Sequence, residues 1–244
     1  MEVKEQYLKI LNIAEKISNK CDAELFISLR INEKITLSTL YFEAFRTFLS
    51  FKLLIDKFYL SQSASILRML IDETARLLIL EKEPNLYKKF LKHRDVRKSI
   101  IDLDEKEQDQ TIIKQFNLNK KDYKNHKKCI TYLDYNWAIE NGGYYSFLNQ
   151  AFGEENNITN WVKLLEQFIH QNINSLDLYD EGKIRRKEEF IYIGCVTFER
   201  LYISFHKTYS EKHILEETDK IFLEKYRIEF EKMLNIAKEA IKQI

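Results

Sequence analysis

Arg68, Asp72 and Arg76 are the first residues whose types and spacing suggest chemistry. Each lies four positions from the next within the apolar run 61–81, so on a helix the three share one face and the acid reaches both guanidinium groups. Because the rest of this run is apolar, we expect the helix to be buried on most sides and its charged stripe to be partly solvated. Two arginines held by one acid are suited to bind an anion. The competing interpretation is an intrahelical salt-bridge ladder that faces another helix.

A second polar stripe follows one side of the helix expected over 159–173. Its members are Lys163, Glu166, Gln167 and His170. Their spacing places a cation, an acid, an amide and an imidazole on one face. A histidine in such a stripe is as consistent with a hydrogen-bonded structural role as with chemistry.

The region 85–128 is basic. It contains thirteen Lys or Arg against seven Asp or Glu, and its densest segment is KKDYKNHKK. The lysines of that segment are Lys120, Lys121, Lys124, Lys127 and Lys128. A surface of this kind can follow the phosphate backbone of RNA. The alternative is an ordinary solvated helical face, which lysine-rich stretches usually are.

Composition favours long helices. The chain of 244 residues can bury a sizeable core, and glycine and proline together occupy only six positions (five and one), which argues against a many-stranded sandwich or barrel. The formal charge of +1 predicts no partner by itself. Cys21, Cys129 and Cys195 lie far apart, which is typical of reduced thiols in a cytosolic protein. No metal-ligand spacing, GxGxxG or P-loop occurs, so we expect no metal and no cofactor.

Hydrophobic periodicity places the helices that must position these residues. Apolar side chains recur at helical spacing over 2–18, 37–60, 61–81, 187–209 and 217–243. The stretch 25–38 alternates like a hairpin around Asn32-Glu33, but Asn-Glu is a poor primed-turn pair, so a helix is favoured there. The longest irregular region, 134–157, holds glycines among aromatic residues, and we expect a loop with one short helix.

These elements predict an all-α fold: an antiparallel helical bundle with one irregular region. We expect a single domain over 1–244, with an N-terminal helical annex at 1–36, a bundle core at 37–209 and a C-terminal packing helix at 217–243. The charged stretch 94–116 is expected to continue as one helix. No apolar run reaches transmembrane length and the amino terminus is amphipathic, so we expect a cytoplasmic protein that does not contact a membrane.

The run SILRMLIDETARLLIL, the charged helix after it and the motif LLEQFIHQNINSL together resemble an uncharacterised family of bacterial helical proteins. In that family an arginine is followed four residues later by an acid, and a later Phe-Val-His-type motif ends a helix. Arg68 and Asp72 match the first pair, and the FIH that ends at His170 matches the second. The family is similar to the HEPN superfamily of helical bundles, many of which are metal-independent RNases of toxin–antitoxin and antiphage systems that act as dimers. The resemblance spans about residues 37–205.

The resemblance implies a ribonuclease site. Metal-free cleavage of RNA uses the 2′-hydroxyl as nucleophile, a base for its proton, an acid for the leaving oxygen and cations for the phosphate. On this basis His170 is the acid or base, and Arg68 or Arg76 contacts phosphate. The active HEPN pattern R-x4-6-H is incomplete here, because no arginine precedes His170 at that spacing and Lys163 is the nearest upstream cation.

Arg200 and His206 satisfy the same pattern formally. Residues six apart on one continuous helix lie on different faces, about 120° apart, so these two converge only if the helix breaks or a second subunit completes the site. We therefore interpret both as structural.

Two functions from different classes follow. The first is a HEPN-like metal-independent endoribonuclease, a defence or toxin effector that acts on RNA as a homodimer or under a cognate antitoxin. The second is a non-catalytic helical module that binds RNA or a protein partner through the basic surface of 85–128.

Overall fold

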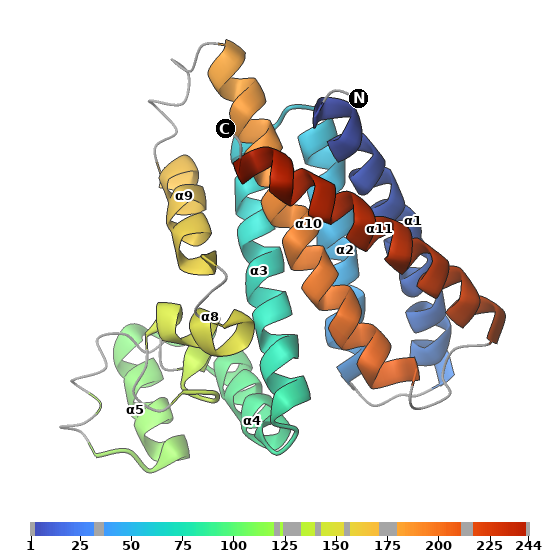
Figure 1. Cartoon of the computed structure of the whole chain (residues 1–244). Coiled ribbons are helices and arrows are strands. Elements are labelled where there is room, and N and C mark those ends of the chain that lie inside the picture. Colours follow the sequence, from blue (N-terminus) through green and yellow to red (C-terminus); the bar gives the residue numbers. More distant parts are fainter. Residues whose placement is uncertain are drawn as a thin grey trace. The chain divides into compact units, whose positions relative to one another are not determined.

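A computed structural model of the chain describes residues 3–31, 37–119, 123, 133–139, 143–153, 157–170, 180–210 and 217–242 (Figure 1). Within these ranges the regular secondary structure is helical and contains no strand, which confirms the predicted all-α class. The chain forms two compact units, and each is described by itself. Unit 1 comprises Met1–Leu78 and Asn160–Ile244, and unit 2 comprises Ile79–Thr159. The expectation of one domain over 1–244 stays a prediction.

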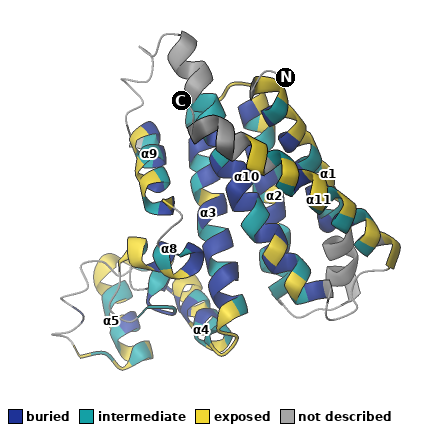
Figure 2. Ribbon diagram, in the orientation of Figure 1, coloured by how far each residue is buried: buried dark blue, intermediate teal, exposed yellow. Residues whose placement is uncertain are grey.

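Unit 1 is built from long helices. They are α1 (Val3–Ile31), α2 (Leu37–Asp56), α3 (Leu60–Lys82) up to Leu78, α9 (Ile158–His170) from Asn160, α10 (Asp180–Ser210) and α11 (Glu217–Lys242). Helix α1 packs against α2, α10 and α11, and α10 in turn packs against α2 and α11. The buried residues follow one side of each helix, as amphipathic periodicity predicts (Figure 2).

The core of unit 1 is aromatic where α2 faces α10. The buried residues of α2 are Tyr41, Ala44, Phe45, Phe48, Phe51 and Ile55, which follow the helical spacing expected over 37–60. Phe48 and Phe198 lie with ring centroids 4.4 Å apart, and Phe45 meets Phe205 edge-to-face at 5.3 Å. The buried hydroxyl of Tyr41 is satisfied by Ser204 on α10 at 2.7 Å. Aromatic contacts of this geometry hold the two helices in register.

Gly194 sets the distance between α2 and α10. A Cβ placed at this position would lie 2.4 Å from Cε1 of Phe51, a contact that real side chains do not make. Phe51 is fully buried, so its ring has little room to give way. Glycine is therefore required here for close approach of the helices rather than for a turn.

Unit 2 contains shorter helices: α4 (Leu86–Ser99), α5 (Glu105–Phe116) and α8 (Tyr144–Phe152). Its hydrophobic cluster comprises Val96, Ile100, Ile112, Tyr123 and Leu133. A second group of rings joins Phe90 to Trp137 at 5.0 Å and Trp137 to Phe147 at 6.1 Å. The irregular region expected at 134–157 therefore contains the short helix α8, and its aromatic side chains are part of this packing.

Three local expectations can be compared with the structure. The stretch 25–31 is helical within α1, so the helix was the correct alternative there, and residues 32–36 lie outside the described part. A continuous helix over 94–116 is wrong, because α4 ends at Ser99 and α5 begins after Asp104, whose carboxylate accepts a hydrogen bond from the Glu107 amide at 2.9 Å. None of the described helices combines the length and apolar character that crossing a membrane requires.

Candidate functional site

Arg68 lies between two carboxylates. Its guanidinium pairs with Asp72 on α3 (Nη1–Oδ1 2.5 Å) and with Glu166 on α9 (Nη2–Oε1 3.7 Å). The Arg68 side chain is only 17% exposed, so little of it is available to a ligand arriving from solvent. Arg68 and Asp72 thus form the salt bridge that their spacing allowed, and the pairing continues to a second helix.

The Arg68–Glu166 ion pair brings α9 against α3. Glu166 lies three residues after Lys163 and four before His170, so the three positions share a face of α9. Lys163 is exposed. His170 is the last residue of α9, and its side chain lies outside the described part of the structure. The ion pair therefore joins Arg68 of α3 to the helix that carries Lys163 and ends at His170.

Arg76 lies on the face of α3 that meets solvent. Met69, seven residues earlier and hence on the same face, is 50% exposed. Around the axis of α3, Arg76 lies between Arg68, which contacts Glu166 of α9, and Glu73, which contacts Thr47 of α2. Arg76 is half-buried, and its charge acts on the carboxyl of Glu73.

Glu73 is the residue of this region that sequence reasoning missed. Burial raises the pKa of its carboxyl to about 7. The hydrogen bond from Thr47 and the charge of Arg76 act in the opposite direction, and the negative charges of Glu43 and Asp72 raise the pKa further. The second carboxyl oxygen, Oε2, is buried without a hydrogen-bond partner. Glu73 is therefore a carboxyl that exchanges a proton near neutral pH, next to a guanidinium.

A signal for Glu73 was present in the sequence. Leu70 and Leu77 lie three residues before it and four after it, which places all three on one face of α3, and both leucines are buried. An acid between two core leucines is expected to be desolvated. What the sequence did not contain was the identity of the opposing helix, which supplies Thr47 and Glu43 from α2.

Arg200 and His206 both lie on the continuous helix α10, where residues six apart are about 120° apart around the axis. The ring of His206 lies 6.1 Å from that of Tyr202, and its charge acts on Glu224 of α11. Glu224 is held by Arg227, which donates to both of its carboxylate oxygens. His206 thus belongs to the contact between α10 and α11, as expected for a structural residue.

The five lysines proposed to bind RNA, Lys120, Lys121, Lys124, Lys127 and Lys128, lie outside the described residues. The described part of the basic region is dominated by α4. Six of its fourteen residues are cationic and one is acidic: Lys88, Lys89, Lys92, Arg94, Arg97 and Lys98 against Asp95. Arg94 pairs with Asp95 at 3.5 Å, which neutralises the one acid of the helix. Arg97 pairs with Asp134.

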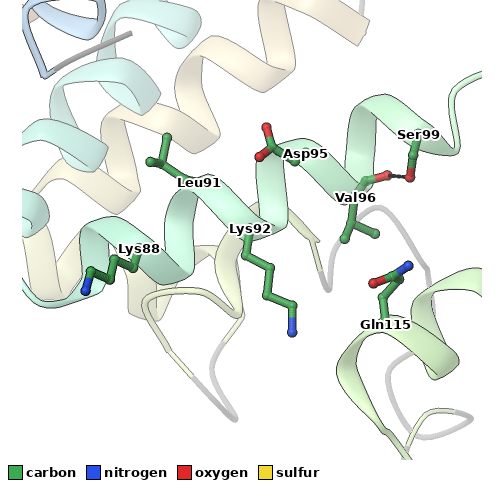
Figure 3. A pocket seen from close by; sticks show the side chains of 7 residues that line it. All are labelled: Lys88, Leu91, Lys92, Asp95, Val96, Ser99 and Gln115. Atoms are coloured by element: carbon green, nitrogen blue, oxygen red, sulfur yellow. Dashed lines mark hydrogen bonds between the residues drawn. The ribbon is translucent and has the colours of Figure 1, made fainter. Parts of the chain in front are cut away.

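An open hollow of about 540 Å³ runs along α4 in unit 2 (Figure 3). Its lining residues are Lys88, Leu91, Lys92, Asp95, Val96, Ser99 and Gln115. All but Gln115 come from one stripe of α4, and Gln115 extends from α5 on the opposite side. Lys88 and Lys92 are exposed, one turn apart, and the ammonium of Lys92 lies 4.9 Å from the ring centroid of Phe116. The hollow therefore offers two cations and hydrogen-bonding groups above an apolar floor.

His93, on the buried side of α4, is a structural histidine. Its ring packs 4.3 Å from that of Phe116 and is hydrogen-bonded to the backbone at Leu133. Burial and the charges of Lys89 and Lys92 lower its pKa to about 4, and the hydrogen bond at Leu133 offsets part of this decrease. The imidazole is therefore neutral at physiological pH and poorly suited to accept a proton there.

Comparison of the chain with models of protein families, with curated proteins and with solved structures finds no match. Among the described residues, no group of three or more His, Cys, Asp or Glu side chains is arranged to hold a metal ion. The interpretation of the site thus depends on the geometry above.

Proposed function

We propose that this chain is an RNA-cleaving effector of the HEPN-like kind, which acts in the cytoplasm without a metal ion. One observation carries the proposal. The ion pair between Arg68 and Glu166 brings together, from distant parts of the sequence, the face of α3 that carries Arg68, Asp72 and Arg76 and the helix that carries Lys163 and ends at His170. Control by a cognate antitoxin and a dimeric state belong to the same proposal.

Each residue of the proposed site has its own role. Arg68 is neutralised by Asp72 and Glu166, so its role is to position α9. Arg76 and Lys163 are the cations that contact the phosphate. His170 acts on the 2′-hydroxyl or on the leaving oxygen.

The test is cleavage of RNA by the purified protein in the presence of EDTA. His170→Ala is expected to lower the rate on the order of 100-fold, because a positioned acid or base typically contributes at least this much. His206→Ala is the matched control, since this histidine lies on the neighbouring helix α10 and outside the proposed site, and it should retain the wild-type rate. Cleavage that is absent from the wild type, or unchanged in His170→Ala, would contradict the proposal.

The charge of α4 favours a second function, an RNA-binding module that does not cleave. The hollow beside α4 is lined by Lys88 and Lys92, two of the six cations of this helix. In this case the wild type binds RNA without cutting it. The double substitution Lys88→Ala, Lys92→Ala should then weaken binding and lower the dependence of log K on log salt by roughly 1 to 2 units.

The double substitution Lys106→Ala, Lys114→Ala is the control for that experiment. Both lysines are exposed on α5 in the same unit and do not line the hollow. The control removes the same two charges, so an equal loss in both variants would show only that net charge matters. A loss confined to the Lys88, Lys92 variant, together with intact RNA, would favour the binding module over the nuclease.

A further inference from the structure

The turn between α2 and α3 has a glycine geometry but contains a phenylalanine. The amide of Phe58 donates to the Ile55 carbonyl (3.2 Å) and the amide of Tyr59 donates to the Leu54 carbonyl (3.0 Å), which is the hydrogen-bond pattern of a Schellman motif. The residue at the position of Phe58 must be left-handed, and its φ is 61°. Glycine or asparagine adopts this conformation readily, whereas a bulky aromatic residue is strained there.

Packing does not explain why the residue is aromatic. Phe58 is 52% exposed, Tyr59 is 55% exposed, and Leu53 on the last turn of α2 is 62% exposed. Most large apolar side chains of unit 1 lie in its core, so three exposed ones in so short a segment are unusual. A strained and exposed aromatic residue indicates a role on the surface.

A cation covers the exposed ring of Phe58. The ammonium of Lys187, on α10, lies 3.7 Å from the centroid of the Phe58 ring and covers one of its faces. Lys57, next to Phe58 in sequence, is exposed. Because Phe58 keeps half of its surface accessible, part of the ring remains open to a flat partner. The charge of Asp56 also acts on Lys187, and Asp56 is paired with Lys52. Lys57 and Lys187 are therefore the cations beside the ring that can meet a negative charge.

The same end of α10 reaches the end of α9. Arg186, the neighbour of Lys187, lies 5.8 Å from the ring centroid of Phe168, and the rings of Phe168 and Phe190 are 5.1 Å apart. Phe168 is two residues before His170. The exposed rings of the α2–α3 turn therefore lie at the end of unit 1 where the proposed catalytic residue is found.

We propose that Phe58 and Tyr59 form a stacking platform for unpaired bases of single-stranded RNA, with Lys57 and Lys187 beside the phosphates. This rests on the proposed function and specifies its substrate: a strand with splayed bases rather than a duplex. Aromatic side chains stack on any base, and neighbouring lysines follow the backbone, so the platform holds the strand without selecting its sequence.

The experiment measures stability and RNA binding in the same variants. All are full-length proteins in a His170→Ala background, so that the RNA stays intact, and the probe is a short fluorescent single-stranded RNA. Phe58→Gly is expected to raise Tm by about 2–4 °C, because it relieves the backbone strain. It should also weaken RNA binding on the order of tenfold, because a stacking surface is lost. Phe58→Trp should keep the affinity.

Ile221→Ser is the control, since Ile221 on α11 is 64% exposed and lies away from the turn in sequence. It should leave binding unchanged. Undiminished binding in Phe58→Gly would overturn the proposal, as would a lowered Tm, which would show that the ring serves packing. A loss of binding to phosphatidylserine-containing vesicles with RNA binding retained would assign the rings to a membrane surface and also overturn it.

The two proposals can fail separately. If the wild type cleaves RNA and Phe58→Gly binds it normally, the platform is wrong and the proposed function stands. If the strand binds through Phe58 but the wild type cuts nothing, the platform stands and the proposed cleavage is wrong.

Discussion

Phe198→Ala is expected to lower the free energy of unfolding of unit 1 by about 3–5 kcal/mol. Phe198 is fully buried on α10, and its ring contacts Phe48 at 4.4 Å, Phe45 at 6.1 Å and Phe230 at 5.5 Å. These partners come from α2 and α11, so truncation opens a cavity where three helices meet. The neighbouring rings are themselves buried and cannot collapse into it without losing contacts. Urea unfolding followed by circular dichroism measures the loss.

Ile203→Ala is the matched control for this substitution. Ile203 lies on the same helix but is 40% exposed, so its truncation opens little cavity and should cost well under about 1 kcal/mol. Equal losses in the two variants would show that the unit is stabilised by α10 as a helix rather than by the aromatic contacts between helices.

Glu73→Gln is expected to stabilise the protein at alkaline pH and to have little effect in acid. The folded-state pKa of Glu73, about 7, is raised above its ordinary value of 4.5. Between these two values the folded protein holds a proton that the unfolded chain has released. The carboxyl therefore favours folding below pH 4.5, and this contribution is lost as the pH rises through 7. The full loss is on the order of 3 kcal/mol.

Because a glutamine stays neutral at every pH, the difference in stability between variant and wild type isolates this one group. Urea midpoints of variant and wild type should nearly coincide at about pH 4 and separate at about pH 8. Glu229→Gln, an exposed acid of α11, is the control and should show no such separation. A constant difference across this range would mean that Glu73 is ionised in the folded state.

The helices were predictable from sequence because their information is local. The apolar seam of α2 and the amphipathic pattern of α11 repeat at helical spacing, and the structure has helices at Leu37–Asp56 and Glu217–Lys242. The break after α4 was missed even though its signal was local, since Asp104 followed by Glu107 is a common helix start. The helix expected over 187–209 begins earlier in the structure, because α10 starts at Asp180.

The candidate site was less predictable because it depends on which helices meet. The pairing of Arg68 with Asp72 follows from a spacing of four residues, but the pairing with Glu166 requires α9 to pack on α3. The same holds for Glu73, whose raised pKa depends on its burial against α2. Periodicity identifies a helix face without specifying its neighbour.

The close contact between Gly194 and Phe51 constrains how this sequence can evolve. A methyl group added at position 194 meets the ring directly, whereas a smaller side chain at position 51 alone would leave a void. Each change is harmful by itself, and the two together restore the volume. The two positions are therefore expected to change together. Homologues that replace the glycine should carry a compensating substitution on the facing helix.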